Sequence, residues 1–412
     1  MLVRGLTAGF TAALLLFATG CAGAPSGPEG SIPSDTSASA ILGPPPCAKH
    51  PTILRVGSRV PSEYLASIDF LSPSVGIGVT LSTVICAQHR SRLGGIQTSP
   101  EPYPGRLAVT RNAGTTWTVE GSQLPKVVRT SLGRASSVAF TTITSGWVAG
   151  NGMLAGTSDG GRQWTLSQLG SPVAGLGVSG NETLALTSPR AGGTSGSWRL
   201  WHTSGTGTSW QPGSVLPIPA VDAFTAFALG PAPGWAAVAV THAITSGRLS
   251  TLVVTSDAGS TWTTRESPCA SNPWFGMAAI AIRAPGAMVS VCEGSGAAGS
   301  TPKGIYVSQN AGATWFPRAL LPALGTRDPT GLPPQDFASL GVSPTGELWI
   351  ATTNELSGSR DGGYSWSAVP GVNLGGNAAV FSFTGPLDGW MLAPGAGLWR
   401  TTNERTWVAV GS

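Results

Sequence analysis

An eight-residue turn that ends in tryptophan returns seven times between positions 110 and 407 of this 412-residue chain. Five copies are regular, one carries Gly205 where an acid or amide belongs, and the last is one residue short. A repeat of roughly 40 to 50 residues indicates that each unit is one supersecondary module, which buries its core only by stacking on its neighbours. The copies are Thr110–Trp117, Thr157–Trp164, Thr203–Trp210, Thr255–Trp262, Ser308–Trp315, Ser359–Trp366 and Thr401–Trp407.

The residue types of the turn predict its shape. An Asp or Asn at the third position can accept hydrogen bonds from backbone amides two residues further on. Glycine at the fifth position supplies a positive φ that larger residues resist, and the hydroxyl residues before the tryptophan tie the turn down. The tryptophan buries a large apolar face, so the pattern predicts a stapled hairpin turn. The third-position residues are Asn112, Asp159, Asp257, Asn310 and Asp361, and the tryptophans are Trp117, Trp164, Trp210, Trp262, Trp315, Trp366 and Trp407.

A second tryptophan lies upstream of several turns. Trp147, Trp349 and Trp390 each precede the tryptophan of a turn by 17 residues. The apolar runs that lead into them, at 137–140, 337–340 and 379–383, are typical of an innermost strand. Each unit then holds four strands, and seven such units predict an all-β fold, a seven-bladed β-propeller of four-stranded antiparallel blades.

The turn resembles the motif of the Asp-box, or bacterial neuraminidase repeat, families, which reads S/T-x-D-x-G-x-T/S-W, and its copies cover most of residues 63–412. Together with the Gly-Trp dipeptides at 146–147 and 389–390, it is more similar to the photosystem II assembly and stability factor family and its non-photosynthetic bacterial relatives than to sialidases. The resemblance implies that the turn joins the third and fourth strands, away from any active site. It also implies a scaffold or assembly role for a protein complex.

The first twenty residues predict a signal peptide. Arg4 is followed by an apolar core at 6–17 that is too short for a membrane span, and then by small residues up to Cys21. This segment resembles a bacterial lipobox with Ala18 in place of the usual Leu, which implies lipidation of Cys21; ordinary secretory cleavage is the alternative. Residues 21–46, rich in Gly, Pro and Ser, form a disordered tether. We expect residues 47–412 to be an extracytoplasmic, monomeric propeller, lipid-anchored to the outer face of the bacterial cytoplasmic membrane.

Charge and cysteine content narrow the classes of function. Only 10% of the residues are charged and the formal net charge is +4, and without a basic stripe we do not expect nucleic-acid binding. Four cysteines besides Cys21 are an even number, which favours disulfides in an oxidising compartment; free buried thiols are the alternative. No cysteine pair has the spacing of zinc ligands, so we expect neither a metal nor a cofactor. Among three connectivities we favour Cys47 with Cys86 and Cys269 with Cys292.

Several units are stretched between their second and third strands, most of all the first, where Ile77 and Trp117 lie 40 positions apart instead of 17. Such insertions emerge on the face opposite the repeated turns, where propellers usually bind partners. We therefore treat the basic and aromatic residues there as the candidate binding site; solvated loops without a partner are the alternative. The candidates are His89, Arg90, Arg92, Tyr103, Arg199, Trp201, His242 and Arg248.

The sequence offers no complete catalytic set. A sialidase needs three arginines around a carboxylate, a Tyr nucleophile with its Glu, and an acid Asp, and only Arg59-Val60-Pro61 resembles part of that set. The four tyrosines and four histidines are scattered. We therefore expect a binding scaffold and not an enzyme, whose partner is an unknown protein or a cell-wall glycan. The alternative is a glycan-binding or glycoside-hydrolysing, sialidase-like propeller.

Overall fold

The computed structural model describes residues 55–411 except for short internal segments. The predicted signal peptide, the tether and Cys47 lie outside the described residues. None of the helices in the described part has the length and apolar character needed to cross a bilayer. The internal segments that are not described are residues 82, 91–95, 129–135, 190–196, 205–208, 219–223, 245–246, 272–274, 297–300, 322–328 and 377–378.

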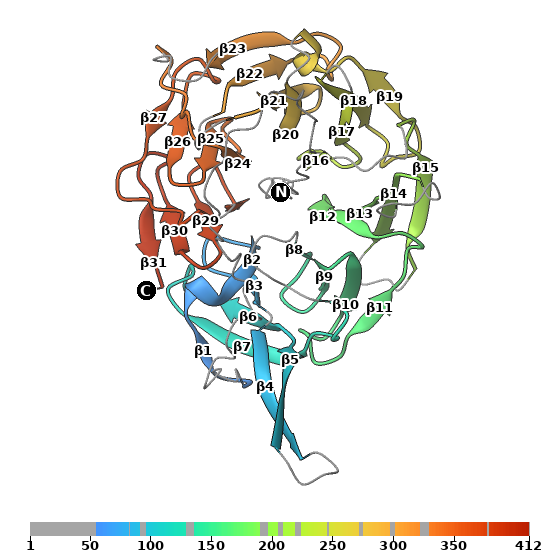
Figure 1. The fold of residues 1–412 in the computed structure, drawn as a ribbon, viewed down its shortest axis with the longest axis vertical. Helices are drawn as coiled ribbons and strands as arrows, with labels where there is room; N and C mark the ends of the chain where they lie inside the picture. The colour runs from blue at the N-terminus through green and yellow to red at the C-terminus, as the bar shows by residue number, and fades with distance from the viewer. Residues whose placement is uncertain are drawn as a thin grey trace, which may run out of the picture.

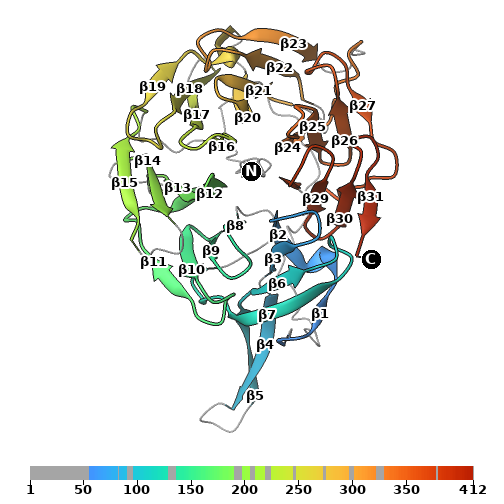
Figure 2. The same cartoon turned by 180° about the vertical axis from the view of Figure 1, so that it is seen from behind.

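The chain forms seven antiparallel blades around a central axis, as the sequence predicts (Figures 1 and 2). In each blade the first strand lies nearest the axis and the fourth lies in the outer wall. The described residues contain no α-helix, only the 3-10 turns η1 (Ser62–Tyr64) and η2 (Pro268–Ser271).

The four strands that make up each blade are arranged in chain order from the axis outward. Blade 1 contains β2 (Leu65–Phe70), β3 (Gly76–Thr80), β6 (Arg106–Thr110) and β7 (Trp117–Gln123). Blade 2 contains β8 (Ser136–Phe140), β9 (Gly146–Gly150), β10 (Met153–Thr157) and β11 (Thr165–Ser167). Blade 3 contains β12 (Val173–Ser179), β13 (Glu182–Thr187), β14 (Arg199–Ser204) and β15 (Gln211–Val215). Blade 4 contains β16 (Phe224–Leu229), β17 (Ala236–Ile244), β18 (Gly247–Thr255) and β19 (Thr263–Arg265).

The remaining three blades repeat this order. Blade 5 contains β20 (Gly276–Ala284), β21 (Ala287–Glu293), β22 (Lys303–Ser308) and β23 (Phe316–Leu321). Blade 6 contains β24 (Phe337–Val342), β25 (Leu348–Thr352), β26 (Leu356–Ser359) and β27 (Ser367–Ala368). Blade 7 contains β28 (Val380–Phe383), β29 (Gly389–Ala393), β30 (Gly397–Thr401) and β31 (Val408–Val410).

The tryptophan-ended turns, here called box turns, join the third and fourth strands of each blade. In the first, the Thr110 hydroxyl donates to Asn112 Oδ1 at 3.0 Å and accepts from the Gly114 amide at 2.9 Å. Asn112 Oδ1 accepts from the Thr116 amide at 2.9 Å. The third-position side chain therefore reaches an amide four residues on, and the predicted bond to an amide two residues on is wrong for the regular copies. The first-position hydroxyl is an equal part of the turn.

Two successive residues of each regular box turn have a left-handed backbone. Glycine at the fifth position has the predicted positive φ, as at Gly114 (89°) and Gly363 (100°). The residue before it is also left-handed, with φ of 61° at Ala113, and this fourth position holds only alanine or glycine in the regular copies. The short seventh copy instead has Glu404, with φ of 52°. Paired positive φ values suit the hairpin twist between two strands.

The Gly-Trp dipeptides begin second strands, and the glycine is required by a ring. At Gly146 an added Cβ would lie 2.2 Å from the ring of Phe140, which ends the first strand of the same blade. Gly389 stands in the same relation to Phe383, at 2.5 Å. The tryptophan that follows is fully buried, with Trp147 only 1% exposed. The dipeptide therefore packs one aromatic ring on each side of a narrow blade.

The hydrophobic cores lie between blades and not within them. Each of the buried clusters draws its residues from two neighbouring blades, and together they cover every junction of the ring. At the junction of blades 7 and 1, Phe70 stacks on Trp390 with 3.8 Å between ring centroids, and its edge meets Trp117. Because a single blade has no core of its own, its stability depends on both neighbours.

The ring closes by this packing, since all four strands of blade 7 come from the C-terminal end of the chain. Ser382 Oγ accepts the amide of Phe70 at 2.9 Å, and Trp390 Nε1 donates to the carbonyl of Ala113 at 3.0 Å. The N-terminal strand β1 (Arg59–Val60) pairs instead with the outer edge of β7, which makes blade 1 a five-stranded sheet.

Replacing Asp257 by Ala should lower the free energy of unfolding by about 1 kcal/mol, because the turn loses a capping acceptor. Asp257 accepts from the amide and the hydroxyl of Thr261 at 2.9 and 2.6 Å. Asp257→Asn is the matched control and should cost less, since Asn112 and Asn310 close their turns in the same way. Urea unfolding of both variants measures the difference, and equal losses would contradict this role for the side-chain oxygen.

Candidate functional site

The connections between second and third strands lie on the face opposite the box turns, here called the loop face. In blade 1 the insertion forms a separate hairpin of β4 (Thr83–Arg90) and β5 (Ile96–Tyr103), inserted between β3 and β6. Both views show this hairpin extending well beyond the outline of the ring (Figures 1 and 2). It is the most prominent projection in the described part of the molecule.

Four of the predicted binding residues belong to this insertion. His89 and Arg90 end β4, and Tyr103 ends β5. Arg92 lies outside the described residues, and so does the pairing predicted for Cys86, because its partner Cys47 is not described. The backbone of Cys86 is opposite Pro100 in the hairpin. A role for these side chains in binding stays a prediction.

The candidates in blade 3 are held by contacts within the blade. Trp201 is half-buried against a core cluster, and its Nε1 donates to Thr187 Oγ1 at 3.1 Å. The guanidinium of Arg199 lies 5.8 Å from the Trp201 ring centroid and donates to the carbonyl of Gly213 at 3.1 Å. Arg199 and Trp201 therefore expose part of an indole ring and the edge of a guanidinium group. Blade 2 lies between them and the hairpin of blade 1.

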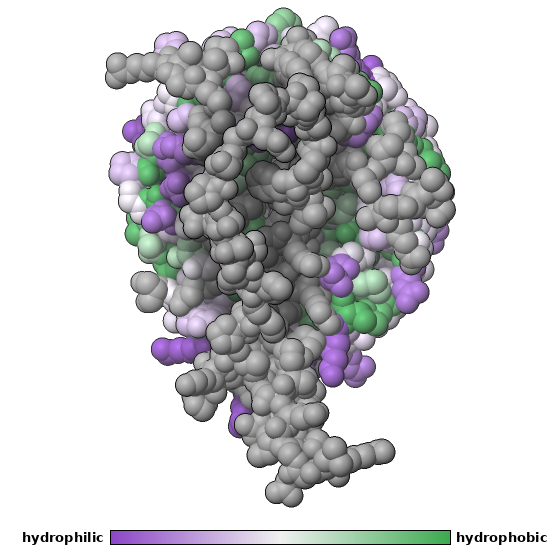
Figure 3. Space-filling model, viewed as in Figure 1, coloured by the Kyte–Doolittle hydropathy of each residue, from purple (hydrophilic) through white to green (hydrophobic). Residues whose placement is uncertain are grey.

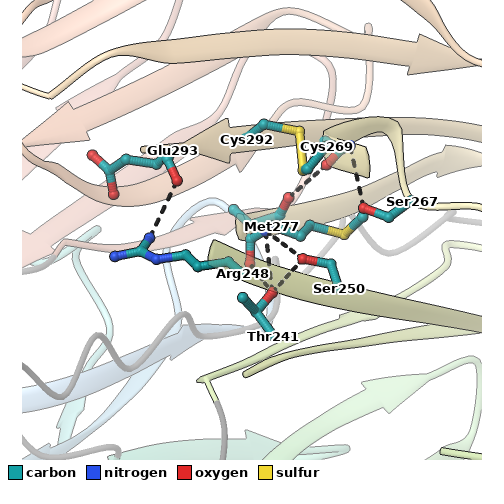
Figure 4. Close-up of a disulfide and its surroundings, with 10 residues drawn as sticks. Thr241, Arg248, Ser250, Ser267, Cys269, Met277, Cys292 and Glu293 are labelled. Carbon is teal, nitrogen blue, oxygen red and sulfur yellow. Dashed lines mark hydrogen bonds between the residues drawn. A yellow bond between two sulfur atoms is a disulfide. The ribbon is translucent and has the colours of Figure 1, made fainter. Parts of the chain in front are cut away.

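In blade 4 the insertion lengthens the strands themselves. β17 and β18 are nine residues each and pair along their whole length, where a longer loop was expected. His242 lies near the tip of this hairpin with its Nδ1 buried and without a hydrogen-bond partner among the described residues. Arg248 donates to the carbonyl of Glu293 at 3.3 Å, so it joins blade 4 to blade 5 (Figure 4). The candidates whose backbone is described thus belong to three different blades, 1, 3 and 4.

A buried disulfide joins blade 4 to blade 5 beside Arg248 (Figure 4). It links Cys269 in η2 to Cys292 in β21, with 5.5 Å between the Cα atoms, and it is the pairing that the sequence favoured. The amide of Met277 is held nearby by the hydroxyls of Thr241 and Ser250, at 3.1 and 3.0 Å. On this side of the loop face, a disulfide and several hydrogen bonds therefore link blades 4 and 5.

Glu293 follows the disulfide and accepts from two groups. Its Oε1 accepts the Thr301 hydroxyl at 2.6 Å and the amide of Phe337, the first residue of blade 6, at 2.8 Å. Burial raises the pKa of Glu293, although these two hydrogen bonds and the nearby Lys303 act in the other direction. The carboxyl group is thus a bridge between blades 5 and 6.

Lys303 lies beside this bridge and is fully buried. Its Nζ donates to the carbonyls of Thr301, Pro333, Pro334 and Gln335, at distances from 2.6 to 3.2 Å. Burial lowers the pKa of Lys303 to about 8, against the opposing charges of Glu293 and Asp336. The sequence analysis did not single out Lys303. The feature that could have identified it is a lysine at the start of an apolar strand, in a chain whose basic residues are mostly arginines.

The strands that face the axis carry almost no groups able to do acid–base chemistry. Asp69 is the single carboxylate on the seven described inner strands. It is 6% exposed, and its Oδ2 accepts the amide of Phe140 from blade 2 at 2.8 Å. In the view of Figure 3, hydrophobic and hydrophilic residues both occur around the visible rim. Within the described residues, no three acids, histidines or cysteines gather as a metal-ligand group.

Comparison with known proteins places the fold. No protein-family model matches the sequence, and no curated protein matches it. YCF48 from Cyanidioschyzon merolae superposes with a TM-score of 0.53 at 16% identity, over 85% of this chain and 99% of that one. YCF48 bound to D1 peptide gives 0.52 at 16% identity, over 87% and 99%. An ancestral GH74 enzyme gives 0.50 at 12% identity, over 86% of this chain and 46% of that one.

These similarities confirm the fold that the repeated turns predict. The solved neighbours include YCF48 and an ancestral GH74 enzyme. At identities this low the likeness concerns the fold alone. One neighbour is bound to a peptide and another is an enzyme, so the function has to be argued from the residues of this chain.

Replacing Lys303 by Met should lower the free energy of unfolding by about 3 to 5 kcal/mol, because it leaves Glu293 and four carbonyls without their buried cation. Lys126→Met is the matched control, since Lys126 is exposed, and it should change stability by less than about 0.5 kcal/mol. Chemical denaturation with fluorescence of the tryptophans measures both. Equal effects of the two substitutions would contradict the bridging role of Lys303.

Proposed function

We propose that this protein is a binding scaffold that holds a segment of another protein on its loop face and assists the assembly or stability of a protein complex. The observation that carries this proposal is the inner surface of the ring. Its described strands carry one carboxylate, Asp69, which is buried and already accepts a hydrogen bond from a backbone amide. Glycoside hydrolysis ordinarily needs a pair of carboxylates about 5 to 10 Å apart.

The surface that remains for a partner is the loop face with its projecting hairpin. That hairpin has eight-residue strands and carries His89 and Arg90. Segments that project from a rigid scaffold are common sites of recognition. The similar structure of YCF48 is bound to D1 peptide, which supports a polypeptide segment as the class of partner here.

A glycan ligand is the second candidate function, because the GH74 neighbour shares the fold over most of this chain. The half-buried Trp201 with Arg199 beside it offers an aromatic face of the kind that can pack on a sugar ring. In this case the protein would bind or cut a cell-wall glycan, and hydrolysis would need carboxylates from loop segments outside the inner strands.

We further propose that the propeller is extracytoplasmic and tethered to the membrane through a lipid on Cys21. The sequence of residues 4–21 supports this anchor, and the disulfide between Cys269 and Cys292 is compatible with an oxidising compartment. A lipid anchor and a flexible tether would let the ring search a membrane-bound complex while remaining outside the bilayer.

Replacing Arg90 and Arg92 together by Ala should reduce capture of the partner by at least about tenfold, as expected for the loss of central arginine contacts. The experiment crosslinks intact cells that carry the tagged protein and identifies what is retained by mass spectrometry. Arg162→Ala is the control, because Arg162 is exposed on the box-turn face, and it should leave capture unchanged. Hydrolysis of xyloglucan or sialosides by the same preparation, without a retained protein, would favour the glycan function instead.

Replacing Cys21 by Ser should move the protein from the membrane fraction to the soluble extracytoplasmic fraction, because the thiol that would take the lipid is gone. Fractionation and metabolic labelling with palmitate check this outcome. A Cys21→Ser protein that stays in the membrane fraction, or a wild type without label, would show that another segment holds the protein there.

A further inference from the structure

Two glutamates meet at the junction of blades 6 and 7, on the box-turn face. Glu347 ends the turn between β24 and β25, and Glu404 belongs to the short seventh box turn. The Thr345 hydroxyl donates to Glu404 Oε2 at 2.6 Å, and the Ser343 hydroxyl lies 2.8 Å from that of Thr345 and accepts the Glu347 amide at 3.1 Å. One short turn therefore holds both glutamates.

Each carboxyl group leaves one oxygen unsatisfied. Glu404 is only 4% exposed, and its Oε1 is buried without a hydrogen-bond partner among the described residues. Glu347 Oε2 is buried and unpartnered in the same way. A buried acceptor without a donor costs about 1 to 3 kcal/mol, and more when it is charged. The site therefore favours a bound cation, or a proton on Glu347.

The charges around the pair decide between these two. Arg360 Nε lies 3.5 Å from Glu347 Oε1, and its Nη2 donates to the Glu404 carbonyl at 3.2 Å. Arg405 also acts on Glu347, and Arg283 reaches the same turn at Gly346 from blade 5. Three arginines against two glutamates leave no net negative charge to attract a metal ion, and the two oxygens are closed to water. Arg360 and Arg405 also oppose protonation of Glu347, but burial and the neighbouring Glu404 outweigh them, so a proton is favoured there.

We propose that Glu347, held beside Glu404 by one short turn, binds a proton that makes the fit between blades 6 and 7 tighter at mildly acidic pH than at neutral pH. This inference is independent of what the loop face binds. The two glutamates lie on the opposite face of the ring, and protonation of Glu347 removes its like-charge repulsion with Glu404. The short seventh box turn carries Glu404 where the regular copies have alanine or glycine, so the regular copies lack this arrangement.

The sign of the pH effect follows from the folded environment. Burial raises the pKa of Glu347 above its ordinary value of 4.5, Glu404 raises it further, and Arg360 and Arg405 oppose both. When folding raises the pKa of an acid, the protonated acid stabilises the folded state. This contribution is complete below pH 4.5, the ordinary pKa, and it is lost as the pH rises through the pKa of the folded protein. The box-turn acids act oppositely: the Gln163 amide lowers the pKa of Asp159 below 3.8, so its contribution is lost only in stronger acid.

The test is the melting temperature of the protein between about pH 5 and pH 8, compared among wild type, Glu347→Gln and Glu404→Gln. Glutamine is the neutral isostere of the protonated acid. The wild type should lose melting temperature as the pH rises, and Glu347→Gln should melt higher than the wild type at pH 8 and show a flatter profile. Because burial also raises the pKa of Glu293, Glu293→Gln is measured in parallel, and the exposed Glu266→Gln is the neutral control.

Hydrogen exchange of the wild type locates the effect without a substitution. Amides of residues 343–347 and 401–407 should exchange more slowly at pH 5 than at pH 8 after correction for the intrinsic rates, while the box turn at 255–262 should not change. Parallel profiles for wild type and Glu347→Gln, or uniform exchange changes over the ring, would overturn the proposal. A melting temperature that rises with Ca²⁺ at fixed pH, and only when Glu347 is present, would overturn it in favour of a cation site.

Discussion

Side-chain oxygens that cap the innermost strands are the interaction on which the ring depends. Each inner strand has one edge paired within its blade, and its other edge has no further strand beside it. Amides on that side need acceptors, and neighbouring blades supply them. Asp69, Ser339 and Ser382 each accept an amide at or next to an inner strand of the following blade. Thr241 and Glu293 do the same at the junctions of blades 4 with 5 and 5 with 6. The cooperative unit is therefore the pair of blades.

The box turns contribute to the same junctions from the outer side. Their left-handed residues leave carbonyl groups that face the preceding blade. Ser122 bonds the carbonyl of Gly161 through both its amide and its hydroxyl, at 2.6 and 2.9 Å, and Ser214 bonds Gly259 in the same way. At blade 5 a guanidinium takes the place of the serine, since Arg265 donates to Ala311 at 3.0 Å. The turn thus has a structural reason to recur in a propeller, whatever the ring binds.

Local patterns predicted the parts of the fold that rest on contacts within one blade. The box turns, the inner strands and the position of the insertions all follow from spacing and residue type over fewer than 50 positions. Cys269 and Cys292 could also be paired, because only 23 residues separate them. Contacts between distant segments could not be predicted, because they leave no local sequence pattern. Phe70 and Ser382, for example, are 312 residues apart, and the strand β1 that pairs with β7 is only two residues long.

The candidate site was predictable only as a set of loops. The spacing assigned Arg199, Trp201 and Arg248 to loops, whereas they lie within the third strands β14 and β18. Their partners are the carbonyls of Gly213 and Glu293 and the hydroxyl of Thr187. Backbone carbonyls carry no signature in a sequence. For the same reason the cage around Lys303 and the pair of Glu347 and Glu404 became visible only when loops from neighbouring blades were brought together.

The position of β1 has a mechanical consequence. Because the chain enters the fold at the outer edge of blade 1, a pull on the N-terminal side is applied first to the hydrogen bonds of Gly57 and Ser58 with Val119. The pairs of Arg59 with Thr118 and Val60 with Trp117 come next. These pairs can peel away one at a time while the stacked rings of Phe70 and Trp390 stay closed. This attachment at the outer edge of blade 1 therefore gives way under load before the ring opens.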